Sequence, residues 1–173
     1  MSDTQFDLDD EPPEHRRYAD YLRALEAVAE ADEASLLRDV LRDEDATMAD
    51  SAVALHMERR AAELLTDPRF VAWAQTVTPL IAGRGFLTRR LDEWTLLRTV
   101  VLGEPWADDV LTGASDWFQR MASTTQLVTS SEALGLLAER GRTRRVRNAA
   151  GRRLRQLTCG AVSRPGDGRP CPP

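Results

Sequence analysis

The chain has few of the residues that build metal sites and disulfide frameworks. Two cysteines and two histidines occur among 173 residues. Cys159 and Cys171 lie in or beside a Gly/Pro-rich tail, where they make neither a disulfide framework nor a metal knuckle. His56 lies in the run HMER, which lacks the second histidine that a metal-binding helix carries four residues later, so we expect a surface or capping role for it. The sequence therefore predicts no metal and no cofactor.

Lysine is absent, because all 23 basic residues are arginine. With abundant alanine, leucine and aspartate, this bias is typical of a bacterial protein from a GC-rich genome, so the number of arginines alone is not a functional signal. Charged residues also interrupt most segments, whereas a membrane span needs about 20 apolar residues. The N-terminal run MSDTQFDLDDEPPE has six acids and no base, the opposite of a secretory or transit signal. We expect a cytoplasmic protein without a membrane partner.

Sequence signatures of catalysis are missing as well. The glycines on either side of Arg84 form too short a run for a dinucleotide-binding fingerprint, and no predicted strand precedes them. The acidic pairs at 92–93 and 108–109 are adjacent in sequence, so on a helix their side chains point about 100° apart and do not converge on one ligand. The sequence predicts no catalytic residues and no enzyme. An enzyme whose site is assembled from scattered polar residues stays an alternative.

Apolar residues recur at helical spacing almost everywhere after Pro13, and no run of β-branched or aromatic residues alternates with a period of two. The sequence therefore predicts a single all-α domain with disordered ends. The expected parts are an acidic arm at 1–12, the helical domain at 13–158 and a Pro/Gly-rich tail at 159–173. About eight helices are expected, near residues 13–31, 32–42, 47–65, 68–81, 86–103, 105–121, 129–141 and 143–156.

Two of the expected helices show their buried faces in the sequence. The third would bury Ala52 and Leu55. The fourth carries the clearest core stripe of the chain, through Phe70, Trp73 and Val77. We expect Trp73 to fill the core rather than stack on a ligand.

A sequence pattern recurs at an offset of 60 residues. The runs LLRDVLRDE, from Leu36, and LLRTVVLGE, from Leu96, share Leu-Leu-Arg and a later Val and Glu. The run ALGLLAERGRTRRVRNAAGRRL, from Ala133, has the same outline of apolar residues around a turn. This pattern of L-x-x-L, a turn, V-x-x-A and L resembles the HEAT class of α-helical repeats. The resemblance implies that helix pairs stack into a short right-handed α-solenoid over about 32–157. An irregular helical bundle is the alternative architecture.

Charge is distributed unevenly along the chain. Residues 1–139 carry 13 arginines and 27 acids, whereas residues 140–173 carry ten arginines and one acid, Asp167. The run GRTRRVRNAAGRRLR from Gly141 to Arg155 alone holds seven arginines. An acidic body with a basic end can attract an acidic partner, nucleic acid included, or close on itself.

The arginines of this run divide into two groups on a helical wheel. One apolar arc is formed by Val146, Ala149, Ala150, Leu154 and Leu157. Arg153 lies inside the arc and Arg147 at its border. An unpaired guanidinium is costly to bury, so we expect each to pair with Glu132 or Glu139 on the preceding helix. The arginines expected to face solvent, and to be the candidate binding residues, are Arg144, Arg145, Arg152 and Arg155.

These observations favour a protein–protein interaction module without catalysis. We expect a small helical adaptor or regulator, or an immunity-type inhibitor encoded beside its protein partner. The alternative is a nucleic-acid-binding protein that uses the arginine-rich last helix, because phosphate contacts need clustered positive charge and no defined sequence. Against that alternative, Asn148 is the only base-reading or stacking type of residue near the basic face.

Overall fold

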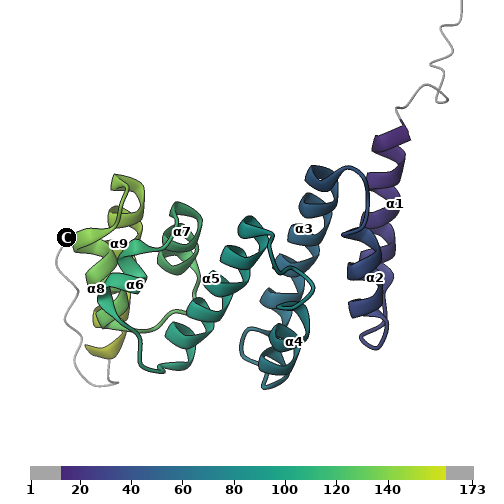
Figure 1. Ribbon diagram of the computed structural model, residues 1–173. Helices are drawn as coiled ribbons and strands as arrows, with labels where there is room; N and C mark the ends of the chain where they lie inside the picture. Colours follow the sequence, from purple (N-terminus) through teal and green to yellow (C-terminus); the bar gives the residue numbers. More distant parts are fainter. Residues whose placement is uncertain (1–12, 163–173) are drawn as a thin grey trace, which may run out of the picture. The chain divides into compact units, whose positions relative to one another are not determined.

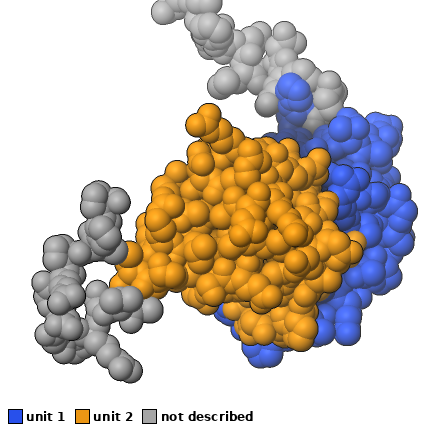
Figure 2. Space-filling model, turned by 90° about the vertical axis from the view of Figure 1, so that its left-hand side faces the viewer, with its two compact units in different colours: residues 1–91 blue, residues 92–173 orange. Residues whose placement is uncertain are grey.

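The computed structural model describes residues 13–162, with side chains described for 15–159. These residues form nine α-helices and no strand, which confirms the all-α prediction (Figure 1). The chain divides into two compact units, residues 1–91 and 92–173, which are coloured separately in Figure 2. The boundary falls inside helix α5. The predicted arm at 1–12 lies outside the described residues, and the single domain expected over 13–158 stays a prediction.

Unit 1 is built around helix α3. Its helices are α1 (Pro13–Ala27), α2 (Glu33–Val40), α3 (Ala46–Leu64), α4 (Arg69–Val77) and the first part of α5 (Gly85–Leu102). Helix α3 contacts α1, α2 and α4 (Figure 1). The stripe predicted for α4 is confirmed, because Phe70, Trp73 and Val77 are all buried. The rings of Phe70 and Trp73 meet edge to face, with 5.6 Å between their centroids.

Unit 2 is built around helix α9. Its helices are the last part of α5, α6 (Asp108–Gly113), α7 (Asp116–Thr124), α8 (Ser131–Arg140) and α9 (Arg144–Val162). Helix α9 packs on both α7 and α8, and α6 packs on α8 (Figure 1). The core contains Phe118 and Leu134, neither of which has any exposed surface. In the same unit, the rings of Trp94 and Trp117 meet edge to face, with 5.4 Å between their centroids.

The single helix predicted near 105–121 is wrong, because two helices occupy this stretch. Ala114 and Ser115 adopt extended backbone conformations between α6 and α7. The hydroxyl of Ser115 accepts a hydrogen bond from the backbone N–H of Phe118, and the Glu93 carboxylate accepts one from the N–H of Ser115 at 2.9 Å. Ser115 therefore caps a new helix, as serine commonly does.

The buried face predicted for α3 is partly wrong. Ala52 is buried as expected, but the side chain of Leu55 is 53% exposed. The next two residues, His56 and Met57, are buried instead. Alanines occur around the whole circumference of α3, so apolar spacing alone does not fix the rotation of this helix.

Two glycines with positive φ mark stops between helices: Gly83 in the turn after α4, which ends at Val77 and not near residue 81 as predicted, and Gly103 directly after α5. Gly83 and Gly103 have φ values of 83° and 70°, a region that favours glycine. Arg84 follows the first of these stops, and its guanidinium donates to the Asp50 carboxylate and to the backbone carbonyl of Leu41. The glycine–arginine–glycine run is therefore a helix break that also ties neighbouring parts of unit 1 together.

The repeat offset of 60 residues is only partly reflected in the packing. Leu37 and Leu97, which the offset pairs, are both buried, at 0% and 1% exposure. Ala62 and Ala122, which it also pairs, differ, because the first is exposed and the second is buried. At the chain end, α9 continues to Val162, so the first four residues of the predicted tail are helical and the rest lie outside the described residues. No helix among those described has the length and apolarity to span a membrane.

Candidate functional site

The rotation predicted for α9 is confirmed. Val146, Ala149 and Ala150 are buried, at 3%, 6% and 0% exposure. The four candidate arginines are all exposed: Arg144, Arg145, Arg152 and Arg155. Within the part of the chain that the structure describes, none of the four forms a side-chain hydrogen bond or an ion pair. Their charges are therefore available to a ligand.

Arg153 is buried as predicted, but the predicted carboxylate partner is wrong. Its guanidinium donates to the backbone carbonyls of Thr125 and Val128, at 3.1 and 2.9 Å, and to the side-chain oxygen of Gln126. These acceptors belong to the connection between α7 and α8. Glu132 and Glu139 are both exposed on α8. Arg153 therefore fixes a loop through neutral acceptors instead of neutralising an acid.

Arg147 also lacks the predicted partner. Its guanidinium donates to the backbone carbonyl of Gly141 at 2.6 Å, at the end of α8. Cations beside the last carbonyls of a helix are favourable, because these carbonyls have no partner within the helix. Arg147 therefore caps α8 from the first turns of α9.

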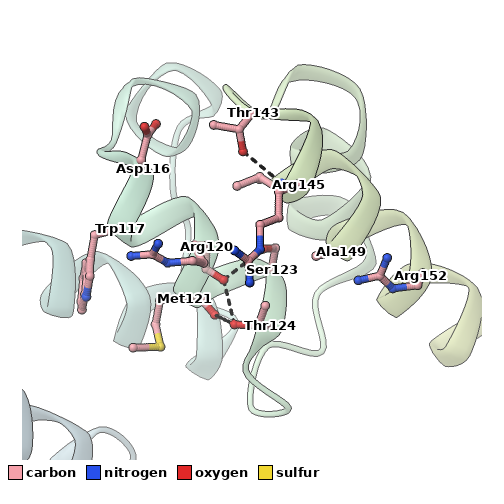
Figure 3. Close-up of a pocket in the computed structure, with 11 residues that line it drawn as sticks. Asp116, Trp117, Arg120, Met121, Ser123, Thr124, Thr143, Arg145, Ala149 and Arg152 are labelled. Atoms are coloured by element: carbon pink, nitrogen blue, oxygen red, sulfur yellow. Dashed lines mark hydrogen bonds between the residues drawn. The ribbon is translucent and has the colours of Figure 1, made fainter.

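A groove of about 700 Å³ lies between α7 and α9, within unit 2 (Figure 3). Arg120 lines it from α7, and Arg145 and Arg152 line it from α9. The apolar part of its lining is formed by Trp117, Met121, Val146 and Ala149. The remaining lining residues are Asp116, Ser123, Thr124 and Thr143.

The structure separates the four predicted arginines into two pairs. Arg145 and Arg152 line the groove, whereas Arg144 and Arg155 are exposed on α9 outside it. Arg120 joins the first pair from α7. Arg120 was not predicted, because nothing in the sequence relates it to an arginine 25 residues later. Only the packing of α7 on α9 brings them together.

Buried hydrogen bonds hold the walls of the groove in place. Gln119, on α7, has no exposed surface. Its side-chain nitrogen donates to the carbonyl of Thr112 at 2.7 Å, and its oxygen accepts from the backbone N–H of Arg142 at 2.8 Å. One amide side chain thus connects the end of α6 to the turn before α9. Because buried polar groups are costly to leave unpaired, this bridge fixes α7 relative to α9.

The other polar cluster of note lies in unit 1 and was not predicted. The Glu33 carboxylate accepts hydrogen bonds from Nε1 of Trp73 at 2.9 Å and from Nε2 of His56 at 2.7 Å. Arg60 approaches the same carboxylate at 3.4 Å. Burial alone raises the pKa of Glu33, but the hydrogen bonds from His56 and Trp73 and the charge of Arg60 outweigh burial, so its pKa lies below the ordinary value.

The surface or capping role predicted for His56 is wrong. The residue is 3% exposed. Arg59 donates to Nδ1 of His56 at 3.2 Å and also to the backbone carbonyl of Leu25 at 2.7 Å. Because arginine can only donate, Nδ1 acts as an acceptor and Nε2 carries the hydrogen that bonds Glu33. The cluster links α1, α2, α3 and α4, and within the described residues Nε of Arg59 is its one buried nitrogen without a hydrogen-bond partner.

The described residues hold no group of three or more His, Cys, Asp or Glu side chains that could bind a metal ion. The groove between α7 and α9 offers instead three exposed guanidinium groups beside an apolar floor. Such a lining binds carboxylates or phosphates through charge-assisted hydrogen bonds and buries apolar groups next to them. It contains no acid–base pair of the kind that general acid–base catalysis needs.

Comparisons with known proteins identify no relative. No family model, curated protein or solved structure matches this chain. Function is therefore inferred from the chemistry of the groove and of helix α9.

Proposed function

We propose that this chain is a non-catalytic protein–protein interaction module that binds its partner through the arginines of α9. It would act as a small adaptor or regulator, or as an immunity-type inhibitor, in the cytoplasm. The observation that supports the proposal is the set of four exposed arginines without a side-chain partner among the described residues, on a helix whose other face is buried. Arginine is enriched at protein interfaces, where its planar guanidinium binds carboxylates in two-pronged geometry.

We further propose that the helices form a HEAT-like repeat array. In unit 2, α7 packs on α9 and α6 packs on α8, so the second helix of one pair lies against the second helix of the next. Stacked helix pairs of this kind present a row of helices as a binding surface. The same helix contacts in unit 2 also occur in irregular helical bundles. The proposed partner binding is the same for a HEAT-like array and for a bundle.

The proposal is tested by replacing Arg144, Arg145, Arg152 and Arg155 together with glutamine. Exposed substitutions usually change stability by less than about 0.5 kcal/mol each, so the variant should fold. Partner proteins captured from native lysate by the wild type should be lost from the variant, after nuclease treatment of both samples. A control with the same loss of charge replaces exposed arginines of unit 1: Arg23, Arg38, Arg42 and Arg89.

The control should keep the partners that the α9 variant loses. If both variants lose the partner proteins equally, binding depends on the total positive charge of the protein and not on α9, which would contradict the proposal. Capture that is unchanged in the α9 variant would show that the exposed arginines of α9 are only solvated.

Nucleic-acid binding is the second candidate, and Arg120 favours it by adding a third positive charge to the groove. In this case binding would disappear after nuclease treatment. The log–log dependence of affinity on salt would become shallower by about one unit for each phosphate contact removed. The salt dependence of the wild type and the fourfold variant therefore separates the two candidates.

A further inference from the structure

We propose that the groove between α7 and α9 binds an acidic segment of a partner protein in which apolar side chains are flanked by carboxylates. The inference rests on the proposed function, because it assigns a ligand class to one part of the arginine surface of α9. Two features of the groove carry it: the position of its three arginines and the apolar floor between them.

The three arginines suit carboxylates that arrive from two sides. Arg120 comes from α7, and Arg145 and Arg152 come from α9, seven residues apart on the same helix (Figure 3). A spacing of seven residues is about two turns, or roughly 10 Å along the axis. All three are exposed and form no side-chain bond within the described part of the chain. A segment with acids on both sides of its centre could therefore meet all three.

The floor of the groove suits apolar side chains. Met121 is half-buried on α7, and Val146 and Ala149 are buried on α9. A methionine thioether adapts to ligands of different shape. Its volume of about 700 Å³ is within the range of protein pockets that bind small-molecule ligands. Carboxylates alone would leave the half-buried Met121 uncovered.

The same lining disfavours a phosphate backbone as the main ligand. Asp116 lies in the groove and pairs with Arg142 at 3.3 Å, so a continuous row of phosphates would pass a carboxylate. A phosphate backbone would also contact Arg144 and Arg155 as readily as the arginines of the groove, because charge attraction does not require the apolar floor. A peptide can place its acids away from Asp116.

The test uses the whole chain and a fluorescent synthetic peptide of about twelve residues, made of Asp, Glu and Ser around a central Leu-Phe pair. Two matched peptides replace the acids with Asn and Gln, or the Leu-Phe pair with Ser-Ser. The groove variant is R145Q/R152Q, and the control variant is R144Q/R155Q. Both variants remove two positive charges from exposed positions of the same helix, so any general effect of charge is equal.

The acidic Leu-Phe peptide should bind the wild type, and the groove variant should weaken binding about tenfold or more. The control variant should weaken it less than about threefold. Both matched peptides should bind at least about tenfold more weakly than the parent. Equal weakening by the two variants, tight binding of the Ser-Ser peptide, or the absence of binding would each overturn the inference.

Two further outcomes separate this inference from the proposed function. If the fourfold α9 variant loses its protein partners but the acidic peptide does not bind, the inference fails and the proposed function stands. If the peptide binds in the groove but the fourfold α9 variant captures the same partner proteins as the wild type, the inference stands and the proposed function fails. Displacement of the peptide by a single-stranded oligonucleotide at lower concentration than by unlabelled peptide would overturn the choice of a protein ligand.

Discussion

The Glu33 side chain joins α2 to α3 and α4 in unit 1. Its carboxylate receives hydrogen bonds from His56 and Trp73 and lies beside Arg60, while the residue itself is 5% exposed. Removing the carboxylate would leave an indole N–H and an imidazole N–H without their acceptor, whereas Arg60 would keep its bond to Glu63. Buried donors that lose their acceptor each cost about 1 to 3 kcal/mol.

We therefore predict that Glu33→Ala lowers the free energy of unfolding by about 3 kcal/mol or more. Glu33→Gln, which keeps an acceptor oxygen, should cost less. Because the native pKa of Glu33 is lowered, the carboxylate stabilises the fold fully above its unfolded pKa of about 4.3. This contribution is lost as the pH falls through the lower native value. Urea unfolding at pH 7 and at about pH 3 measures both effects, and a difference between wild type and Glu33→Gln that does not shrink in acid would contradict them.

Arg153 allows a second test, because its neighbour in sequence supplies the control. Arg153→Met removes the donors that hold the carbonyls of Thr125 and Val128, so we expect a loss of about 2 to 4 kcal/mol. Arg152→Met changes an exposed side chain and should stay within about 0.5 kcal/mol. The denaturant midpoints of the two variants measure this difference in stability. Similar midpoints would show that the connection between α7 and α8 does not depend on Arg153.

The sequence predicted which residues are buried better than it predicted their hydrogen-bond partners. The wheel of α9 placed Val146 and Ala149 inside and Arg152 outside, because an apolar arc must dock. It could not show that Arg153 would use loop carbonyls, since sequence displays acids but not backbone acceptors. The contact of Glu33 with Trp73 could not be predicted either, because nothing in the sequence relates two residues that lie 40 positions apart.

Helices were predictable wherever a strong apolar stripe or a glycine stop marks them. The stripe of α4 contains large side chains on one face, and Gly83 supplies the backbone conformation that ends the following turn. The break before α7 was not predicted. Nothing in the sequence around Ser115 marks it as the N-cap of a new helix, and this role is visible only in the structure. The groove between α7 and α9 depends on packing between helices, which periodicity within one helix cannot reveal.

Two glycines at α8 predict opposite effects of the same substitution. A Cβ atom at Gly141 would lie 2.5 Å from the carbonyl oxygen of Leu137 and 2.7 Å from Cγ1 of Val146. Gly141→Ala should therefore cost about 1 to 3 kcal/mol, because helices α8 and α9 must move apart. Gly135, inside α8, has open space around such an atom, so Gly135→Ala should stabilise the protein by about 0.5 to 1 kcal/mol. Thermal unfolding of both variants checks the signs, and a stabilising Gly141→Ala would contradict the close approach.

For the whole molecule, the sequence makes one prediction on residues outside those described. The acidic arm lacks a periodic apolar face, and the tail from Ser163 is dense in proline and glycine. Neither segment can bury enough apolar surface to offset the entropy of ordering. Removing residues 1–10 and 163–173 should leave the thermal midpoint within about 3 °C, as measured by circular dichroism. A larger drop would show that one of the ends packs on the helices.

The close approach of α8 and α9 has a consequence for the kinetics of any complex that unit 2 forms. The two helices meet through small residues, with Ala150 fully buried and Gly151 near Ala138. Small residues at this contact leave little room for α9 to shift against α8, so a ligand of the groove meets an α9 wall that is already in its bound position. The ordering cost of association then falls on the ligand and on the long arginine side chains. Charge attraction should therefore give a high association rate constant, and changes to the ligand should act mainly on the dissociation rate constant.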